Sequence, residues 1–436
     1  MQQKNIDESR LPNRSLQLYL ALYSGLCVIA VWSIFLISEY WQIDSIGKIL
    51  SFYPSDAPGS VAITCIPDPI GLHYFGDFVS VVCHSNLGSP YLDTSTNYFP
   101  VAYLLMKIFY PLMHASLWIG IGFFYSMGAL SLIYVLNKLL KSSMGVFEIG
   151  MVLFIVVGTA QPVISLIDRG NLQMIVTLLV LFSALEMSKT SEGNRYDALA
   201  IGIATALKGY PLIFAFRYLA AREYKRFFLT VFFAAASTLL ALTSFRGGIF
   251  ANFNPMKDAI LGFRGGERNW LRYNVSLKGM LYSIQHENFF GLGGAVEWVI
   301  NHYLLVIVVL ACVAVFILIR LPLVLSEQFL LGAVFCGLLV DYTSSYVLTL
   351  FLVPLLLILK RDSFTKLNIC YLAIIALLMI PKGISLSNDP ENHANSISTT
   401  FSDHMPSFAS IVNPFLMLLL GIIIGTTAIM RPKPII

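Results

Sequence analysis

The sequence predicts an all-α protein that crosses a membrane many times, and two observations lead to this prediction. Of its 436 residues, 57% are hydrophobic and 12% are charged, whereas a soluble globular chain averages about 45–50% apolar and about 25% charged residues. The apolar residues also gather in stretches of roughly 20, the length that a helix needs to cross the hydrocarbon core. An ordinary cytosolic protein, a nucleic-acid binder and a disordered chain are therefore excluded.

Ten apolar stretches are predicted to span the membrane within a single integral membrane domain, residues 1–436. The strong predictions are 16–38, 116–137, 146–166, 171–188, 227–244, 299–319, 343–360 and 409–430, and the weaker ones are 323–341 and 367–381. The first stretch is too long for a signal peptide, and no small-residue cleavage pattern follows it.

Two further stretches are helical in pattern but too polar to cross. Segment 97–113 contains Pro100, Lys107 and Pro111, and we expect a juxtamembrane helix there. Segment 197–220 is interrupted by Lys208-Gly209-Tyr210-Pro211, where proline removes a backbone donor and disfavours helix at the preceding residue. We expect two half-helices that form a hairpin on the cytoplasmic side, which makes twelve helices in the membrane.

The distribution of basic residues orients these spans. With both termini in the cytoplasm, the inner segments hold 17 of the 28 Lys and Arg residues and the outer loops hold 10, in agreement with the positive-inside rule. The outer loops are then 39–115, 245–298 and 382–408, long enough that we expect ordered, functional structure in them. In this topology Lys208 lies on the inner hairpin, and we expect it not to reach an outer active site.

The cysteines predict one disulfide at most. Cys65 and Cys83 both fall in the first outer loop, where an oxidising compartment allows a bridge; the alternative is two free thiols. No Cys/His pattern with metal-ligand spacing and no phosphate-binding glycine loop occurs in the sequence. We therefore expect no cofactor, and the sequence leaves a need for a divalent metal open.

Charged groups at the outer membrane edge point to a reaction. Carboxylates occur there at Asp77 and Asp168, and a carboxylate can take the proton of an attacking hydroxyl as a general base. Loop 245–298 adds basic residues that suit a phosphate, or that form a plain solvated face: Arg264, Arg268, Arg272 and Lys278. One acid plus cations is sufficient for glycosyl transfer from a sugar phosphate.

Several short runs, in order along the chain, resemble the polytopic C-type glycosyltransferases, nearest to glycosyltransferase family 87. The most specific is the "Lys-x-x-Pro" hairpin at 202–212. The other runs are 73–78 (His-Tyr-Phe-Gly-Asp-Phe), 88–91 (Gly-Ser-Pro-Tyr), 97–100 (Asn-Tyr-Phe-Pro), 169–171 (Arg-Gly-Asn) and 274–279 (Asn-Val-Ser-Leu-Lys-Gly). Two departures stand out, because Val101 replaces a second proline and the later motif reads Asp341-Tyr342 instead of being rich in histidine.

The resemblance implies an inverting glycosyltransferase in a bacterial cytoplasmic membrane, active on its outer face. Asp77 matches the general base, and Asp168 loosely matches a second acid. The donor would be a polyprenyl-phosphate sugar, such as the mannosyl form, and the acceptor a hydroxyl of a lipid or glycan. Further residues that we expect to contact substrate are His73, Tyr91, Tyr98, Asn171, Asn274 and Tyr342.

Two other functions fit the same residues. A polysaccharide polymerase or ligase also has large outer loops and basic residues. A flippase or transporter of lipid-linked glycan is less favoured, because transporters place charge near the midplane and often repeat in two halves. The sequence contains no second copy of the 197–220 hairpin. If the protein transfers a sugar, its predicted partners are the lipid bilayer, the polyprenyl-phosphate sugar donor and a glycolipid or glycan acceptor. Nucleic acid is not a predicted partner.

Overall fold

A computed structural model gives the architecture of the chain. It describes residues 14–40, 75–91, 98–140, 150, 159–188, 195–263, 274–286, 291–340, 343–360, 365–382 and 407–431. Within these ranges every regular element is a helix, which confirms that the fold is all-α; the predicted number of spans stays a prediction.

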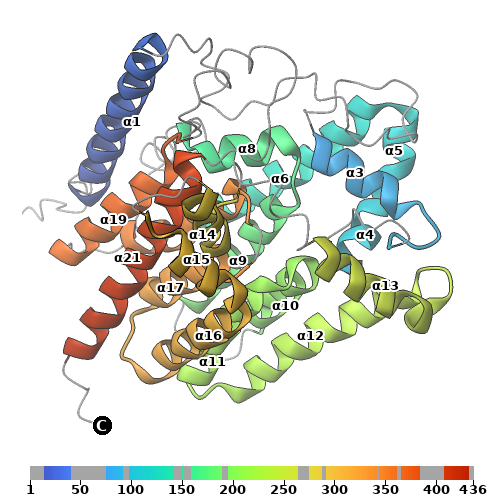
Figure 1. The fold of residues 1–436 in the computed structure, drawn as a ribbon. Helices are drawn as coiled ribbons and strands as arrows, with labels where there is room; N and C mark the ends of the chain where they lie inside the picture. The colour runs from blue at the N-terminus through green and yellow to red at the C-terminus, as the bar shows by residue number, and fades with distance from the viewer. Residues whose placement is uncertain are drawn as a thin grey trace, which may run out of the picture.

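The helices differ widely in length (Figure 1). In chain order they are α1 (Arg14–Tyr40), α3 (Gly76–Ser85), α4 (Pro100–Met106), η2 (Lys107–Phe109), α5 (Tyr110–Ala115), α6 (Leu117–Leu140), α8 (Gln161–Arg169), α9 (Gln173–Met187), α10 (Tyr196–Lys208), η3 (Tyr210–Ala215), α11 (Phe216–Ala220), α12 (Tyr224–Thr243), α13 (Gly248–Phe263), α14 (Leu277–His286), α15 (Gly293–Asn301), α16 (Tyr303–Arg320), α17 (Leu325–Leu338), η6 (Ser345–Phe351), α18 (Leu352–Leu359), α19 (Lys366–Met379) and α21 (Phe408–Met430).

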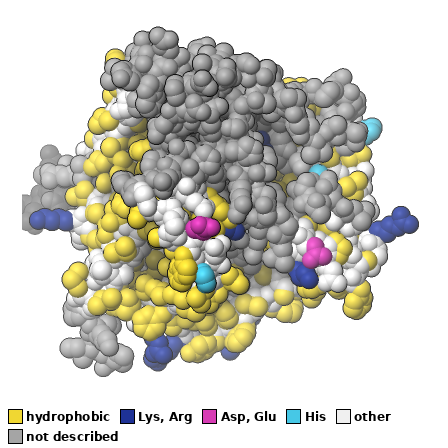
Figure 2. All heavy atoms as spheres, viewed as in Figure 1, with side chains coloured by type: hydrophobic (Ala, Val, Ile, Leu, Met, Phe, Trp, Pro, Cys, Tyr) yellow, Lys and Arg dark blue, Asp and Glu magenta, His cyan; other side chains and the backbone are white. Residues whose placement is uncertain are grey.

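Four helices of the described chain are long and apolar enough to cross a membrane. They are Leu117–Tyr134 within α6, and all of α12, α16 and α21. Shorter apolar helices stand at other predicted spans, in α1, α9, α17, α18 and α19. Large apolar side chains such as Trp118, Phe232 and Leu304 are more than half exposed, and Figure 2 shows hydrophobic side chains over much of the described surface. The chain is therefore a polytopic membrane protein.

The predicted span 146–166 is wrong in one respect, because its helix does not continue to residue 166. Ala160 has an extended backbone, and the separate helix α8 begins at Gln161 with Pro162 in its first turn. Proline is favoured at a helix start, where its missing N–H costs nothing. Figure 1 shows α8 lying across the upper end of the bundle. The chain therefore turns at residue 160, and α8 ends beside α3.

Of the two segments expected to be too polar to span, 197–220 is broken where the sequence predicts, whereas 97–113, expected to be one juxtamembrane helix, contains more than one short helix. Residues 100–115 form α4, η2 and α5, with prolines at the starts of α4 and α5. The segment 196–220 breaks after Lys208, where Gly209 has φ +70°. A side chain at Gly209 would lie 2.8 Å from the ring of Phe99, so the glycine allows both the turn and the close approach of residue 99.

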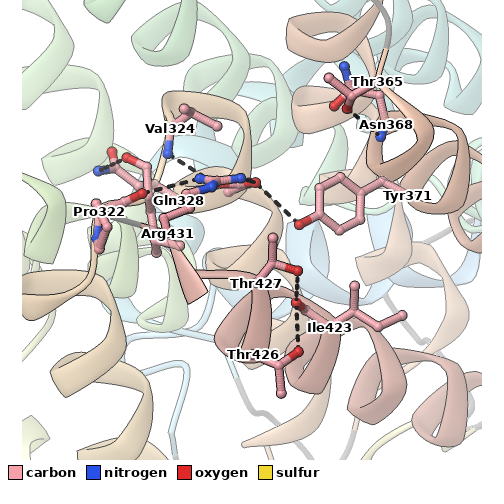
Figure 3. A network of polar contacts seen from close by, with 12 residues as sticks. Pro322, Val324, Gln328, Thr365, Asn368, Tyr371, Ile423, Thr426, Thr427 and Arg431 are labelled. Atoms are coloured by element: carbon pink, nitrogen blue, oxygen red, sulfur yellow. Dashed lines mark hydrogen bonds and ion pairs between the residues drawn. The ribbon is translucent and has the colours of Figure 1, made fainter. Parts of the chain in front are cut away.

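An ion pair with a buried carboxylate joins three helices (Figure 3). Glu327 near the start of α17 accepts two bonds from Arg431 just after α21, at 2.5 and 2.6 Å. The Tyr371 hydroxyl on α19 donates to the same carboxylate at 3.2 Å, and the Val324 N–H donates at 3.1 Å. A bidentate pair with added hydrogen bonds satisfies a buried charge, so this site, the Glu327 cluster, connects α17, α19 and α21.

Candidate active site

The turn after α8 and the start of α3 hold each other in place. The Gly170 N–H donates to the Ile167 carbonyl and the Asn171 N–H to the Leu166 carbonyl, the pattern of a Schellman cap. Gly170 has φ +61°, and a side chain there would meet Phe78 of α3 at 2.8 Å. The Phe75 N–H donates to the Asp168 carbonyl at 2.7 Å. The residues after α8 are thereby placed directly against the first turn of α3.

Asp77 lies in that first turn, where the helix dipole favours a negative charge. Its Oδ1 accepts from Arg169 Nη2 at 2.6 Å and from Arg169 Nε at 3.2 Å. The exposed fraction of the Asp77 side chain is 17% and that of Arg169 is 28%. The pair is thus partly open, and only one oxygen of the carboxylate is engaged by the arginine.

Asn171 connects the carboxylate to the rest of the site. Its Nδ2 donates to Asp77 Oδ2 at 2.5 Å and to the Tyr98 hydroxyl at 2.9 Å. Its Oδ1 accepts from the Gln173 N–H at 2.8 Å and from Lys208 Nζ at 3.0 Å. The side-chain amide has two donors and two acceptor positions, so all four are used within the protein. These bonds fix the orientation of Asn171 and, through it, that of Asp77.

Lys208 belongs to this site, and the prediction that it would not reach the active site is wrong. Besides its bond to Asn171, its ammonium lies 4.8 Å from the ring centroid of Tyr98 and 5.1 Å from that of Tyr346 on η6. The break after α10 therefore directs a cation toward Asp77. We refer to Asp77, Tyr98, Arg169, Asn171, Lys208 and Tyr346 together as the Asp77 cluster.

Asp168 lies beside the cluster, at the last turn of α8. Its pKa is raised to about 6, chiefly because the side chain is largely buried; the Arg169 guanidinium opposes this rise and the Asp77 carboxylate adds to it. A carboxyl with a pKa near 6 changes its charge within the physiological range. It is therefore a second group that can influence proton transfer at this site.

The two predicted tyrosines differ in their surroundings. Tyr98 is half-buried and contributes both its hydroxyl and its ring to the Asp77 cluster. Tyr91 is 3% exposed, packs edge-on against Tyr103 and Phe245, and donates its hydroxyl to the Tyr98 carbonyl at 3.1 Å. Tyr91 thus supports Tyr98 from behind, and only Tyr98 is placed to meet a ligand.

Asn274 and Lys278 lie on the segment that leads into α14. The buried Asn274 side chain accepts from the Thr343 and Ser276 N–H groups, each at 3.1 Å, and the Val275 N–H donates to the Thr343 carbonyl at 2.7 Å. Asn274 thereby joins this segment to the start of η6. Lys278 has its ammonium 5.4 Å from the ring centroid of Tyr303 and 5.9 Å from that of Tyr282.

The remaining predicted residues fall outside the described part of the chain. These are His73, Arg264, Arg268, Arg272, Tyr342 and Cys65. Cys83 is described and half-buried on α3, and its predicted bridge to Cys65 stays a prediction. Within the described ranges, no three His, Cys, Asp or Glu side chains gather closely enough to hold a metal ion.

Sequence reasoning did not assign site roles to Arg169, Lys208 and Tyr346. Arg169 stands in one of the runs that resemble the family, but nothing in the sequence pairs it with Asp77. A basic residue at a helix break inside an apolar region was the available signal for Lys208, because buried charge in a membrane protein is costly and usually functional. No comparable signal marks Tyr346.

The geometry brings a carboxylate, a guanidinium and an ammonium together at the junction of four segments. Such a site can accept a proton and neutralise a negatively charged leaving group. The family model of glycosyltransferase family 87 matches residues 97–347, more than half of the chain. Neither the curated proteins nor the solved structures include a match.

Proposed function

Because the chain belongs to glycosyltransferase family 87, and is therefore a membrane glycosyltransferase, we propose that it transfers a sugar from a polyprenyl-phosphate donor to a hydroxyl of a lipid or glycan acceptor. The reaction inverts the anomeric carbon and takes place on the extracytoplasmic face of a bacterial cytoplasmic membrane. Asp77 is the general base, and Asp168 is a second functional acid.

The arrangement around Asp77 is the single observation that supports this proposal most. Among the described residues its Oδ2 accepts one hydrogen bond, from Asn171, and a carboxylate oxygen offers two lone-pair positions. One position on Oδ2 is therefore left for an acceptor hydroxyl. Arg169 and Asn171 hold the carboxylate in one orientation, as a base that must meet a hydroxyl at hydrogen-bond distance requires.

A lipid-linked donor suits the surroundings of the site. The chain is a polytopic membrane protein whose apolar helices can lie alongside an isoprenoid tail, and the sugar phosphate can then enter from the membrane surface. The outer-loop residues Arg264, Arg268, Arg272 and Lys278 stay candidates for contacts to the donor phosphate. Tyr98 and His73 stay candidates for contacts to the sugar.

A transfer assay tests the proposal. Purified protein in nanodiscs is given a radiolabelled polyprenyl-phosphate sugar, a polyprenyl-diphosphate sugar or a nucleotide sugar, together with a membrane lipid extract as acceptor. We expect transfer from the monophosphate donor alone, and a loss of about 10²–10⁴-fold in Asp77→Asn, the usual contribution of a general base.

Three outcomes contradict the proposal in different ways. Transfer from the diphosphate donor alone would favour a polymerase or ligase. Movement of lipid-linked glycan across vesicles without transfer would favour a flippase. Full transfer by Asp77→Asn would remove Asp77 as the base while leaving the donor class intact. Labelling a cysteine introduced near residue 77 from outside intact cells tests the face of the membrane.

A further inference from the structure

We propose that Lys208 is the residue that binds the phosphate of the lipid-linked donor, and that it stabilises this phosphate as it leaves the sugar. The inference rests on the proposed function and extends it, because it assigns the leaving-group site to the break after α10. The outer-loop basic residues named above lie on a different segment of the chain.

The hydrogen bonds of Lys208 leave room for a ligand. An ammonium group has three N–H donors, and among the described residues the only acceptor that it reaches is Asn171 Oδ1. It forms no ion pair within the described part of the chain. The residue as a whole is half-buried. A phosphate offers several oxygens to the two remaining donors.

The aromatic surroundings stabilise the charge of Lys208 without using its donors. The rings of Tyr98 and Tyr346 lie 4.8 and 5.1 Å from the ammonium, within the range of cation–π attraction. This attraction offsets part of the cost of burying the ammonium before a ligand arrives. Arg169 differs from it, because Arg169 already donates two bonds to Asp77.

The backbone keeps Lys208 in this position. It is the last residue of α10, and the Gly209 N–H donates to the Thr205 carbonyl at 2.6 Å. Gly209 turns the chain with φ +70°, and the Phe99 ring packs against it. Asn171 therefore lies between the Lys208 ammonium and the Asp77 carboxylate and bonds to both. An acceptor at Asp77 and a leaving group at Lys208 would thus contact the same cluster.

The charge changes during transfer make a cation at this place effective. The acceptor oxygen forms a bond to the anomeric carbon and its proton passes to Asp77, while the bond between that carbon and the phosphate oxygen breaks. The donor phosphodiester has one negative charge, and the polyprenyl phosphate that leaves is a monoester with up to two. A fixed cation therefore interacts more strongly with the leaving group than with the bound donor, which accelerates the reaction.

Binding of a phosphate and of its uncharged analogue tests the inference. A short-chain polyprenyl phosphate and the matching polyprenol are titrated into nanodiscs holding the wild type, Lys208→Gln, Lys208→Arg or Asp77→Asn. We expect the wild type to prefer the phosphate by tenfold or more, and Lys208→Gln to lose about ten- to hundredfold in affinity for the phosphate, as for a charge-assisted hydrogen bond. Polyprenol should bind equally to all variants, and Lys208→Arg should retain part of the preference.

Asp77→Asn separates this inference from the proposed function. If Asp77→Asn binds the phosphate but does not transfer sugar, and Lys208→Gln binds it as the wild type does, the assignment of Lys208 is wrong and the function stands. If the wild type has no preference for the phosphate and does not use the monophosphate donor, the proposed function itself fails. Competition by inorganic phosphate distinguishes a headgroup site from one that requires the lipid tail.

Chemical protection provides a second measurement if Lys208→Gln does not fold. The wild type is treated with formaldehyde and a mild reductant, and methylation of each lysine is measured by mass spectrometry. Polyprenyl phosphate should reduce the labelling of Lys208 at least severalfold, whereas polyprenol should not. Equal labelling with both ligands would overturn the assignment. Lys257, which is exposed on α13, serves as the internal control.

Discussion

The Asp77 cluster and the Glu327 cluster each contain a carboxylate paired with an arginine, but they differ in how completely the carboxylate is satisfied. Glu327 is 4% exposed, and both of its oxygens accept from Arg431. Asp77 is 17% exposed, and Arg169 engages only Oδ1. The hydroxyl of Tyr371 and the N–H of Val324 complete the Glu327 site, whereas the described part of the chain leaves Asp77 Oδ2 with only the bond from Asn171.

The difference indicates how to distinguish a structural ion pair from a catalytic one in a membrane protein. The Glu327 pair connects three helices and uses its hydrogen-bonding capacity within the protein, as expected for stability. The Asp77 cluster brings a second cation, Lys208, near the carboxylate without forming an ion pair between them. An incompletely satisfied carboxylate beside an additional cation is typical of a site that binds a charged ligand.

The largest expected effect is that substituting one carboxylate mainly reduces transfer, whereas substituting the other mainly reduces stability. Asp77→Asn should reduce transfer by about 10²–10⁴-fold and lower the melting temperature in detergent less than Glu327→Gln does, because the Asp77 carboxylate is more exposed than that of Glu327. Glu327→Gln should destabilise the fold by about 3 kcal/mol, as when a buried pair loses one partner, while the folded fraction keeps its turnover. Thermal unfolding and transfer are measured on the same preparations. If both variants lost only stability, the two clusters would not differ in kind.

The next effect concerns the amide that connects the Asp77 cluster. Asn171→Ala removes four hydrogen bonds and frees Asp77 to rotate, so we expect a loss of roughly 10²-fold in kcat. Asn368→Ala is the control, because Asn368 is also buried and lies on α19, the helix that carries Tyr371 of the Glu327 cluster. The control should change turnover less than threefold. Similar losses in both variants would mean that Asn171 acts only through packing.

A pH profile gives a smaller effect. Since the pKa of Asp168 is about 6, its carboxylate is charged above pH 6 and neutral below it, and kcat/KM should fall below that pH. Asp168→Asn should remove this inflection. Because the ordinary pKa is 3.8, the folded chain binds more protons than the unfolded chain between these values. The group therefore lowers stability as the pH rises from about 4 to 6. An unchanged profile in Asp168→Asn would assign the titration to another group.

The smallest effect comes from removing one hydroxyl in each cluster. Tyr98→Phe loses the bond from Asn171 but keeps the ring beside Lys208, so we expect a two- to tenfold fall in transfer, about the value of one hydrogen bond. Tyr371→Phe loses its bond to Glu327 and should lower only the melting temperature. A change in stability alone for Tyr98→Phe would contradict the distinction between the clusters.

Local features of the site were predictable, whereas the contacts between them were not. Asp77, Asn171 and the break after Lys208 were each identified from composition, turn residues and resemblance. The contact between Lys208 and Asn171 was not predicted. Counting basic residues assigns a loop to one side of the membrane, but it does not say how deep into the membrane a broken helix places its side chains. The pairing of Glu327 with Arg431 joins residues 104 apart, a separation at which sequence patterns predict no contact.

The break at residue 160 was missed for a different reason. Hydropathy is continuous through 146–166, so a window of 20 residues reads it as one span. Gln161 and Pro162 were the local signal of a new helix start. Their effect on the backbone outweighed the apolar character of the segment, and the turn that holds Arg169 and Asn171 depends on it.

Both ends of α8 are anchored to distant parts of the chain. Its first residue, Gln161, accepts from the Lys382 N–H at 3.0 Å, and its last turn accepts from the Phe75 N–H. A truncated chain that ended before α19 would still contain every residue of the Asp77 cluster. It would lack the hydrogen bond from Lys382 to Gln161, which holds the first residue of α8. Such a fragment would be a poor catalyst on its own, and co-expression of the missing C-terminal piece, as in split-protein complementation, would be the way to restore it.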